Sequence, residues 1–286
     1  MKRRDFLATA GAALPAGALA ANNWRGLAAA TSGGNDAALR SAHVRLALRH
    51  ATSPAVDVAC AASDRAALLT QCATDIDRLC AGASRPDVIL LPDHGLCGWD
   101  HWQPDHLASI APAADGVEMA LLSAQAKRCN VYLLLGGWWL PANSTVAASA
   151  TWLIAPSGRR CKLGESVVHT DIGNWVRVAS APDESAQRRL SAAGAEWIIV
   201  GSGPPLAARA QAPLVCISQG RAYGAVPPGC PDIASDLSPF RSEVRSSGTG
   251  LLARSSGGEP QTLIATAPLQ ALRTARHAQQ RRQITD

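Results

Sequence analysis

Hydrophobic positions along the first hundred residues switch between the two-residue spacing of strands and the wider spacing of helices. Residues 44–49 alternate apolar and basic side chains, which predicts a first strand. Ser63 is a suitable N-cap for a helix that follows. Its apolar positions recur with helical spacing at Leu68, Leu69, Cys72, Ile76, Leu79 and Cys80. Residues 87–91 are a short apolar run ended by Pro92, which predicts a strand buried on both faces. Together they predict a β-α-β unit with parallel strands.

The same alternation continues through the rest of the chain. A helix over 117–129 is expected to lead into a strand over 131–135, and two strand-like runs meet at a turn over 155–158. The second arm of this predicted hairpin carries Lys162. Further elements are expected as a strand at 175–179, a helix at 182–193, strands at 196–200 and 213–217, a hairpin over 241–255, a strand at 261–267 and a helix at 269–281.

This order of elements predicts the α/β fold class in a single domain over residues 40–281. The chain has 286 residues, 47% of them hydrophobic and 17% charged, enough to bury one large core. It contains no linker, repeat or low-complexity tract in that range.

The first thirty residues have the order of an export signal. Arg3 and Arg4 precede a mildly apolar segment over 6–20, and small residues offer cleavage after Ala20 or Ala30. This resembles a twin-arginine signal, which predicts a periplasmic protein; the alternative is a chance basic start. Its removal leaves a charge of about +2 from the formal +5, too little for a nucleic-acid footprint. No other apolar run approaches the length of a membrane span.

Eight cysteines are spread widely, without a C-x-x-C pair, so neither a zinc ribbon nor a thioredoxin-type site is indicated. Cys72 and Cys80 fall on one predicted helix, about 12 Å apart, too far to bridge. An exported chain could still hold one or two disulfides, and the spacing does not select the partners.

Candidate binding residues gather after the strand that ends at Pro92. Asp93-His94, Asp100-His101 and Asp105-His106 could suggest a metal, but their spacing in a predicted loop matches no common metal motif, and we predict solvated side chains with no metal or cofactor. Trp99, Trp102, Trp138 and Trp139 flank predicted strand ends, where they could line a ligand site or serve in packing. Of these groups, the candidate binding residues are His94, Trp99, Trp138 and Trp139.

Several segments, in order, resemble the nitrilase, or carbon–nitrogen hydrolase, superfamily. The family's P-E-x-x-x-x-G-Y is similar to Pro92-Asp93-His94-Gly95-Leu96-Cys97-Gly98-Trp99, and its P-x-G hairpin with an R-K step is similar to 156–162. Its G-A-E pattern before an apolar strand is matched at 194–200, and its last hairpin, strand and helix by 238–269. The resemblance implies a four-layer αββα sandwich of two mixed sheets and a homodimer.

It also implies a cysteine nucleophile, a glutamate that moves the proton and a lysine that stabilises the developing charge. Lys162 takes the lysine position, and Asp93 takes the glutamate position with a reach shorter by about 1.5 Å. The nucleophile position falls at 178–181, where Ser180 is the available substitute, because no cysteine lies between Cys161 and Cys216.

Two functions remain open at this point. One is an exported, catalytically degenerate member of this fold that binds an amide- or nitrile-like small molecule or a partner. The other is an active amidase-like hydrolase using Asp93, Lys162 and Ser180 or another substitute nucleophile.

Overall fold

The computed structural model describes most of the predicted domain. The described residues are 43–50, 52–53, 61–92, 96, 104–163, 167–170, 177–180, 184–200, 215–218, 222–223, 242–246, 250–255, 261–268 and 274. The export signal and nearly all of the predicted closing helix lie outside them. No helix in the described ranges has the length and apolar character that crossing a membrane requires.

A first six-stranded sheet has the order β14-β1-β3-β4-β5-β6. Its strands are β1 (His43–His50), β3 (Val88–Leu90), β4 (Tyr132–Trp139), β5 (Ala148–Ile154), β6 (Arg160–Leu163) and β14 (Gln261–Pro268). β1, β3 and β4 are parallel, and the other pairs are antiparallel, so the sheet is mixed. The predicted β-α-β unit is therefore confirmed, with the buried run before Pro92 as a central strand.

A second six-stranded sheet has the order β13-β12-β10-β9-β8-β7. It contains β7 (Val168–His169), β8 (Arg177–Ser180), β9 (Trp197–Val200), β10 (Val215–Ser218), β12 (Glu243–Ser246) and β13 (Gly250–Arg254). β8, β9 and β10 are parallel, as the second predicted β-α-β unit requires. β2 (Thr52–Ser53) and β11 (Ala222–Tyr223) form a separate short pair.

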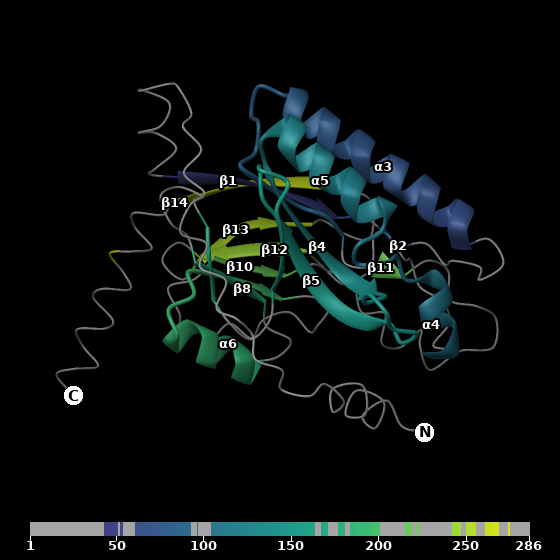
Figure 1. The fold of residues 1–286 in the computed structure, drawn as a ribbon. Helices are drawn as coiled ribbons and strands as arrows, with labels where there is room; N and C mark the ends of the chain where they lie inside the picture. The colour runs from purple at the N-terminus through teal and green to yellow at the C-terminus, as the bar shows by residue number, and fades with distance from the viewer. Residues whose placement is uncertain are drawn as a thin grey trace.

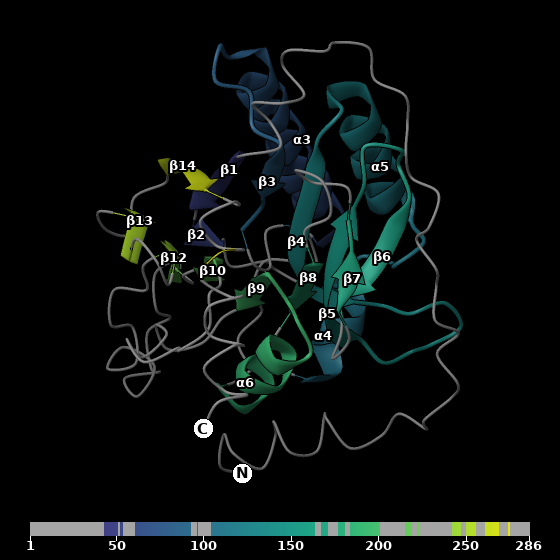
Figure 2. The ribbon, with the colours of Figure 1, turned by 90° about the vertical axis from the view of Figure 1, so that its left-hand side faces the viewer.

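Two long helices, α3 (Ala61–Ala81) and α5 (Val117–Cys129), lie side by side over one face of the first sheet (Figure 1). The turned view places α6 (Glu184–Ala192) at the other end of the molecule, beside β9 (Figure 2). α5 matches its predicted bounds. α3 starts at Ala61, ahead of the predicted N-cap Ser63, because alanines with high helix propensity precede that serine.

A short helix, α4 (Pro104–Ile110), replaces part of the predicted loop. Asp105 and His106 therefore belong to a helix, and the prediction that this pair lies in a loop is wrong. The start at Pro104 has a simple cause: proline fits the first helical turn, where its missing N–H is not needed. The side chains of Asp93, His94, Asp100 and His101 lie outside the described residues.

The first sheet separates two clusters of buried side chains. The inter-sheet core, between the two sheets, includes Leu46, Leu90, Leu134 and the fully buried Trp197 of β9. The helix-side core, between this sheet and the helices, includes Ile89, Leu135, Met119 and Ile76. Successive strand residues alternate between the two because side chains of a strand point to opposite faces in turn.

A partly buried ion pair fastens α3 to the sheet. Arg49 of β1 donates from Nε to a carboxylate oxygen of Asp75 at 2.8 Å, and the side chains are 16% and 9% exposed. Gln71 donates to the other oxygen of Asp75 at 3.2 Å. A partnered carboxylate can be buried here at modest cost, because its lone pairs are occupied.

Candidate functional site

β3 ends in the middle of the first sheet, immediately before the predicted acid. All three of its residues are fully buried, and the N–H of Leu91 still donates to the carbonyl of Leu134 at 2.8 Å. Pro92, which follows, has no N–H and cannot extend this ladder. Asp93, His94 and Trp99 lie outside the described residues. The structure therefore describes the end of the strand that precedes these three residues in the sequence.

β4 continues beyond its predicted end, through Gly136 and Gly137, to Trp138 and Trp139. Gly137 has φ +149°, a value that side-chain-bearing residues rarely adopt. As neighbours on a strand, the two tryptophans point to opposite faces of the sheet, so they cannot both line the same ligand site. Trp139 is 2% exposed in the helix-side core and meets Trp152 edge-to-face, with ring centroids 6.2 Å apart.

Trp138 is half-buried and pairs with Ser149 on the inter-sheet face of the strand. It stands near the carboxyl end of β4, the end at which ligands of parallel α/β sheets bind. Of the two candidate tryptophans on β4, Trp138 is therefore the half-buried one near the strand end, and Trp139 is packed within the helix-side core.

Lys162 lies on β6, which ends the first sheet. It pairs with Trp152 across the antiparallel ladder, and opposite residues in such a ladder share a face. Trp152 packs against the helix-side core, whereas Leu163 and Cys161, which flank Lys162 in sequence, belong to or pack against the inter-sheet core. The exposed Lys162 side chain is therefore on the face of its sheet that points away from the second sheet.

Ser180 is the last residue of β8 in the second sheet, and it pairs with Ile199 of β9. α6 begins at Glu184, so Ser180 occupies a step from a strand to a helix. Its side chain is outside the described part of the structure. β6 and β8 lie against each other where the sheets meet, which brings the strands of Lys162 and Ser180 together although Lys162 faces the other way.

Cys161 is the residue of β6 that does face the second sheet. Burial raises the pKa of its thiol, with Arg159 acting in the opposite direction, and the thiol donates to the carbonyl of Lys162 at 3.6 Å. A protonated thiol is a weak nucleophile, so this environment does not activate it. The sequence of β6 already contains the signal for the directions in which Cys161 and Lys162 point. Apolar and charged residues alternate along this strand, so the two kinds lie on opposite faces.

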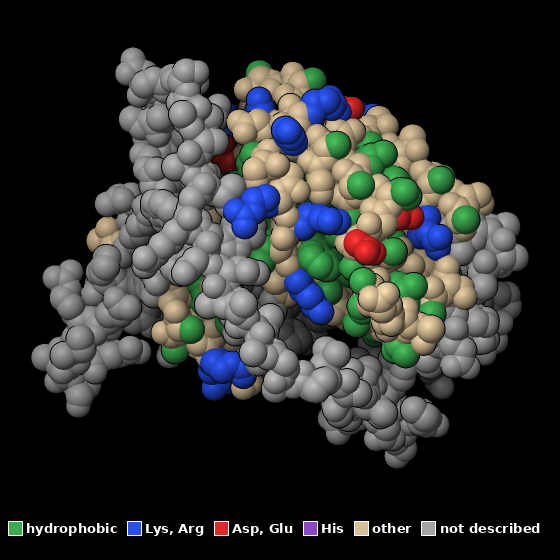
Figure 3. All heavy atoms as spheres, viewed as in Figure 1, with side chains coloured by type: hydrophobic (Ala, Val, Ile, Leu, Met, Phe, Trp, Pro, Cys, Tyr) green, Lys and Arg blue, Asp and Glu red, His purple; other side chains and the backbone are tan. Residues whose placement is uncertain are grey.

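The hairpin face is basic in its surroundings. Arg159, Arg160 and Lys162 are all exposed, and Figure 3 shows more Lys and Arg than Asp and Glu side chains on this side of the molecule. Arg160 donates to the carbonyl of Ala114 at 3.3 Å, which ties the hairpin to the turn before α5. Within the described ranges, no group of three His, Cys, Asp or Glu side chains is placed to hold a metal ion.

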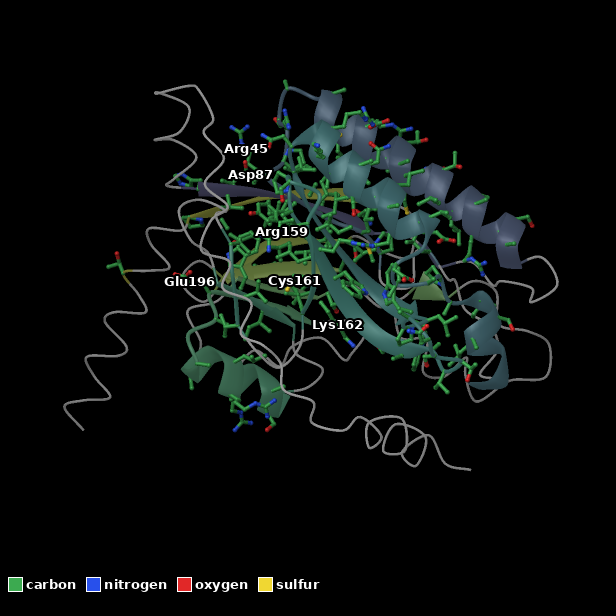
Figure 4. All side chains as sticks on the ribbon, in the orientation of Figure 1. Arg45, Asp87, Arg159, Cys161, Lys162 and Glu196 are labelled. Atoms are coloured by element: carbon green, nitrogen blue, oxygen red, sulfur yellow. The ribbon has the colours of Figure 1, made fainter. Side chains whose placement is uncertain are left out.

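At the opposite end of the parallel strands, Asp87 sets the register of the first sheet. Its carboxylate accepts a hydrogen bond from the N–H of Arg45 at 2.9 Å, and its own N–H donates to the carbonyl of Arg45 at 2.9 Å (Figure 4). These two bonds hold β1 and β3 level at their starts. Pro92, which precedes Asp93 in the sequence, and Ser180 lie at the other ends of the parallel strands.

Sequence comparison finds no matching family profile and no matching curated protein. Solved structures do match. An amidase of the nitrilase superfamily from Nesterenkonia, in a mutant form, is 17% identical with a TM-score of 0.58, over 85% of this chain and 98% of that one. In another structure of that amidase, the acetamide moiety of fluoroacetamide is covalently added at the active-site cysteine.

Two further structures extend the similarity to other organisms. A Saccharomyces cerevisiae member of branch 10 of the nitrilase superfamily is 14% identical with a TM-score of 0.60, over 82% of this chain and 94% of that one. A carbon–nitrogen hydrolase from Helicobacter pylori is 12% identical with a TM-score of 0.60, over 84% and 94%. From this agreement over nearly the whole of each neighbour, the chain has the fold of the nitrilase superfamily of carbon–nitrogen hydrolases.

Proposed function

We propose that this protein is an exported, catalytically degenerate carbon–nitrogen hydrolase homologue that binds an amide- or nitrile-like small molecule. The observation that carries this proposal is the orientation of Lys162. A lysine that stabilises charge on a reaction intermediate must project to where the nucleophile meets the substrate. Lys162 instead faces the helix side of its sheet, away from the sheet that carries Ser180.

The residue types support the same conclusion. Asp93 is a methylene shorter than the glutamate that the resemblance implies, and no cysteine occurs between Cys161 and Cys216. The Nesterenkonia amidase, by contrast, has an active-site cysteine that forms a covalent adduct. A serine at position 180 would need a well-placed base far more than a thiol does, because its pKa lies much further from neutrality.

We propose further that the two sheets and their flanking helices stack as a four-layer αββα sandwich, and that two copies form a dimer. The inter-sheet core and the helix-side core support the layered arrangement. Trp138, on the inter-sheet face near the end of β4, is the described residue that we assign to ligand binding.

The test measures turnover and binding on the same proteins. Wild type, Lys162→Ala and the matched control Arg160→Ala, which changes a charge on the same face of β6, are incubated with short aliphatic amides and nitriles and scored for ammonia. We expect no turnover that depends on Lys162. Calorimetric titration with the same compounds should show binding that Trp138→Ala weakens about three- to tenfold and Arg160→Ala leaves intact.

Turnover lost in Lys162→Ala and kept in Arg160→Ala would instead support the second candidate, an active amidase-like hydrolase using Asp93, Lys162 and Ser180. In that case Ser180→Ala would also abolish ammonia release. Loss in Cys161→Ser with retention in Ser180→Ala would identify the thiol on the inter-sheet face as the nucleophile.

A further inference from the structure

The last turns of α3 and α5 lie at the same end of the helix pair. Each helix precedes one of the parallel strands β3 and β4, so both run in the same direction. Cys80 is the penultimate residue of α3, and Cys129 is the last residue of α5, before the left-handed cap at Asn130. The fold therefore brings two cysteines that are 49 residues apart in sequence to adjacent helix ends.

Asp77 links the two helices at this point. Its carboxylate accepts a hydrogen bond from the guanidinium of Arg128, and the same oxygen lies 3.8 Å from the Sγ atom of Cys129. Asp77 and Cys80 are three residues apart on α3 and so share a face of that helix. The contact of Cys129 with Asp77 therefore places its thiol on the face of α3 that also carries Cys80.

The environment of Cys80 agrees with this placement. Burial raises the pKa of this thiol to about 12, and a hydrogen bond with the Cys129 side chain adds to the effect. The other two cysteines whose side chains the structure describes stand elsewhere: Cys72 is two turns earlier on α3, and Cys161 faces the second sheet. Both Cys80 and Cys129 carry free thiols in this structure.

We propose that Cys80 and Cys129 are a disulfide-forming pair that clips the end of α3 to the end of α5. The oxidant is a low-molecular-weight disulfide. A thiolate of the pair attacks one sulfur of glutathione disulfide and releases one glutathione thiolate, and the second cysteine then attacks the mixed disulfide and releases the other. Two protein thiols lose two protons and two electrons, and glutathione disulfide takes them up as two glutathione thiols.

This bond would stabilise the folded protein from a position away from the candidate site. The bond would close a loop of 49 residues that contains β3 and α4, and long loops give the larger entropic effect on the unfolded chain. It lies where β3 and β4 begin, whereas Pro92 and Trp138 lie where these strands end. The inference therefore stands apart from the proposed function, and a failure of one leaves the other unchanged.

The experiment starts from the reduced full-length protein in native buffer at about pH 8.5, where a thiol with a raised pKa has more of its reactive thiolate. Glutathione disulfide is added, free thiols are then blocked in acid, and the peptides are mapped by mass spectrometry. We expect a linked peptide pair that contains Cys80 and Cys129 and is lighter by two hydrogens than the separate peptides. The melting temperature should rise by on the order of 5 °C upon oxidation.

Three variants separate this bond from general oxidation. The rise in melting temperature should disappear in Cys80→Ser and in Cys129→Ser and should persist in the matched control Cys72→Ser, which changes a cysteine on the same helix. The peptide map of the wild type tests for the bond between Cys80 and Cys129 directly, even if a variant fails to fold. Free Cys80 and Cys129 thiols after oxidation, or linkage of either to another cysteine, would overturn the proposal.

Discussion

Cys72 shows how burial controls the chemistry of one side chain. It lies on the helical stripe that the sequence predicted and is buried in the helix-side core. Burial raises the pKa of its thiol to about 12, the charge of Asp75 adds to the rise, and Arg49 opposes it. Such a thiol stays protonated in the folded protein at pH values where an unfolded cysteine ionises.

This difference makes the stability depend on alkaline pH. Because the folded pKa is raised above the ordinary value of 9.0, the contribution is complete below pH 9 and is lost as the pH approaches 12. In reduced protein the free energy of unfolding should fall by up to about 1.4 kcal/mol per pH unit through this one group. Urea unfolding between about pH 9 and 11 should show a shallower fall in Cys72→Ala, and an identical slope would contradict the assignment.

The face that each charged residue takes was only partly predictable. Lys162 was correctly placed on the second arm of a hairpin, because the turn residues before it are specific. Its orientation follows from its apolar neighbours Cys161 and Leu163, which face the second sheet. The site roles of four residues remain predictions, because the side chains lie outside the described part of the structure: Asp93, His94, Trp99 and Ser180.

At the scale of elements, the β5–β6 hairpin depends on one glycine. Gly158 has φ +82°, and its N–H donates to the carbonyl of Ala155 at 2.8 Å to close the turn. An added Cβ would lie 3.4 Å from the carbonyl oxygen of Ser123 on α5, at the tight edge of ordinary contact. Both the conformation and the contact disfavour a side chain.

Gly158→Ala should therefore destabilise the protein by about 1–2 kcal/mol in urea unfolding. Gly82→Ala is the matched control: Gly82 follows α3, and an added Cβ would lie 3.6 Å or more from its neighbours. The control should change stability by less than about 1 kcal/mol. Equal losses in both variants would show that the turn conformation is not the cause.

The elements themselves were predicted better than their lengths. Turn residues and apolar periodicity correctly located β1, α5, the β5–β6 hairpin and the two β-α-β units, because these signals are local. β4 was predicted too short, since Gly136 and Gly137 normally mark a strand end. Their pairing with β5 carries the strand onward, and a cross-strand partner is not visible in one segment of sequence.

At the scale of the whole molecule, the first sheet joins the first and the last strands that the structure describes, β1 and β14. β1 and β14 pair antiparallel from His43 opposite Pro268 to His50 opposite Gln261. The first sheet is therefore complete only after nearly the whole chain has been made. Such long-range pairing could not be predicted from local patterns, which gave the strands without their order.

This closure fits our proposal that the protein is exported folded through the twin-arginine route. Replacing both arginines, in Arg3→Lys with Arg4→Lys, should retain the protein in the cytoplasm, as measured by cell fractionation and immunoblotting. Arg25→Lys changes a basic residue outside the arginine pair and should leave export intact. Periplasmic recovery of the double variant would contradict the assignment.

The position of β6 at the border of its sheet gives Arg160 and Lys162 a further consequence. Among the described strands, β6 has a sheet neighbour on one side, and an open border can recruit strands from other molecules. Two positive charges within four residues would repel the same border of a second copy. Lys162, to which the resemblance gives a catalytic role, would thus help to prevent edge-to-edge aggregation of the protein.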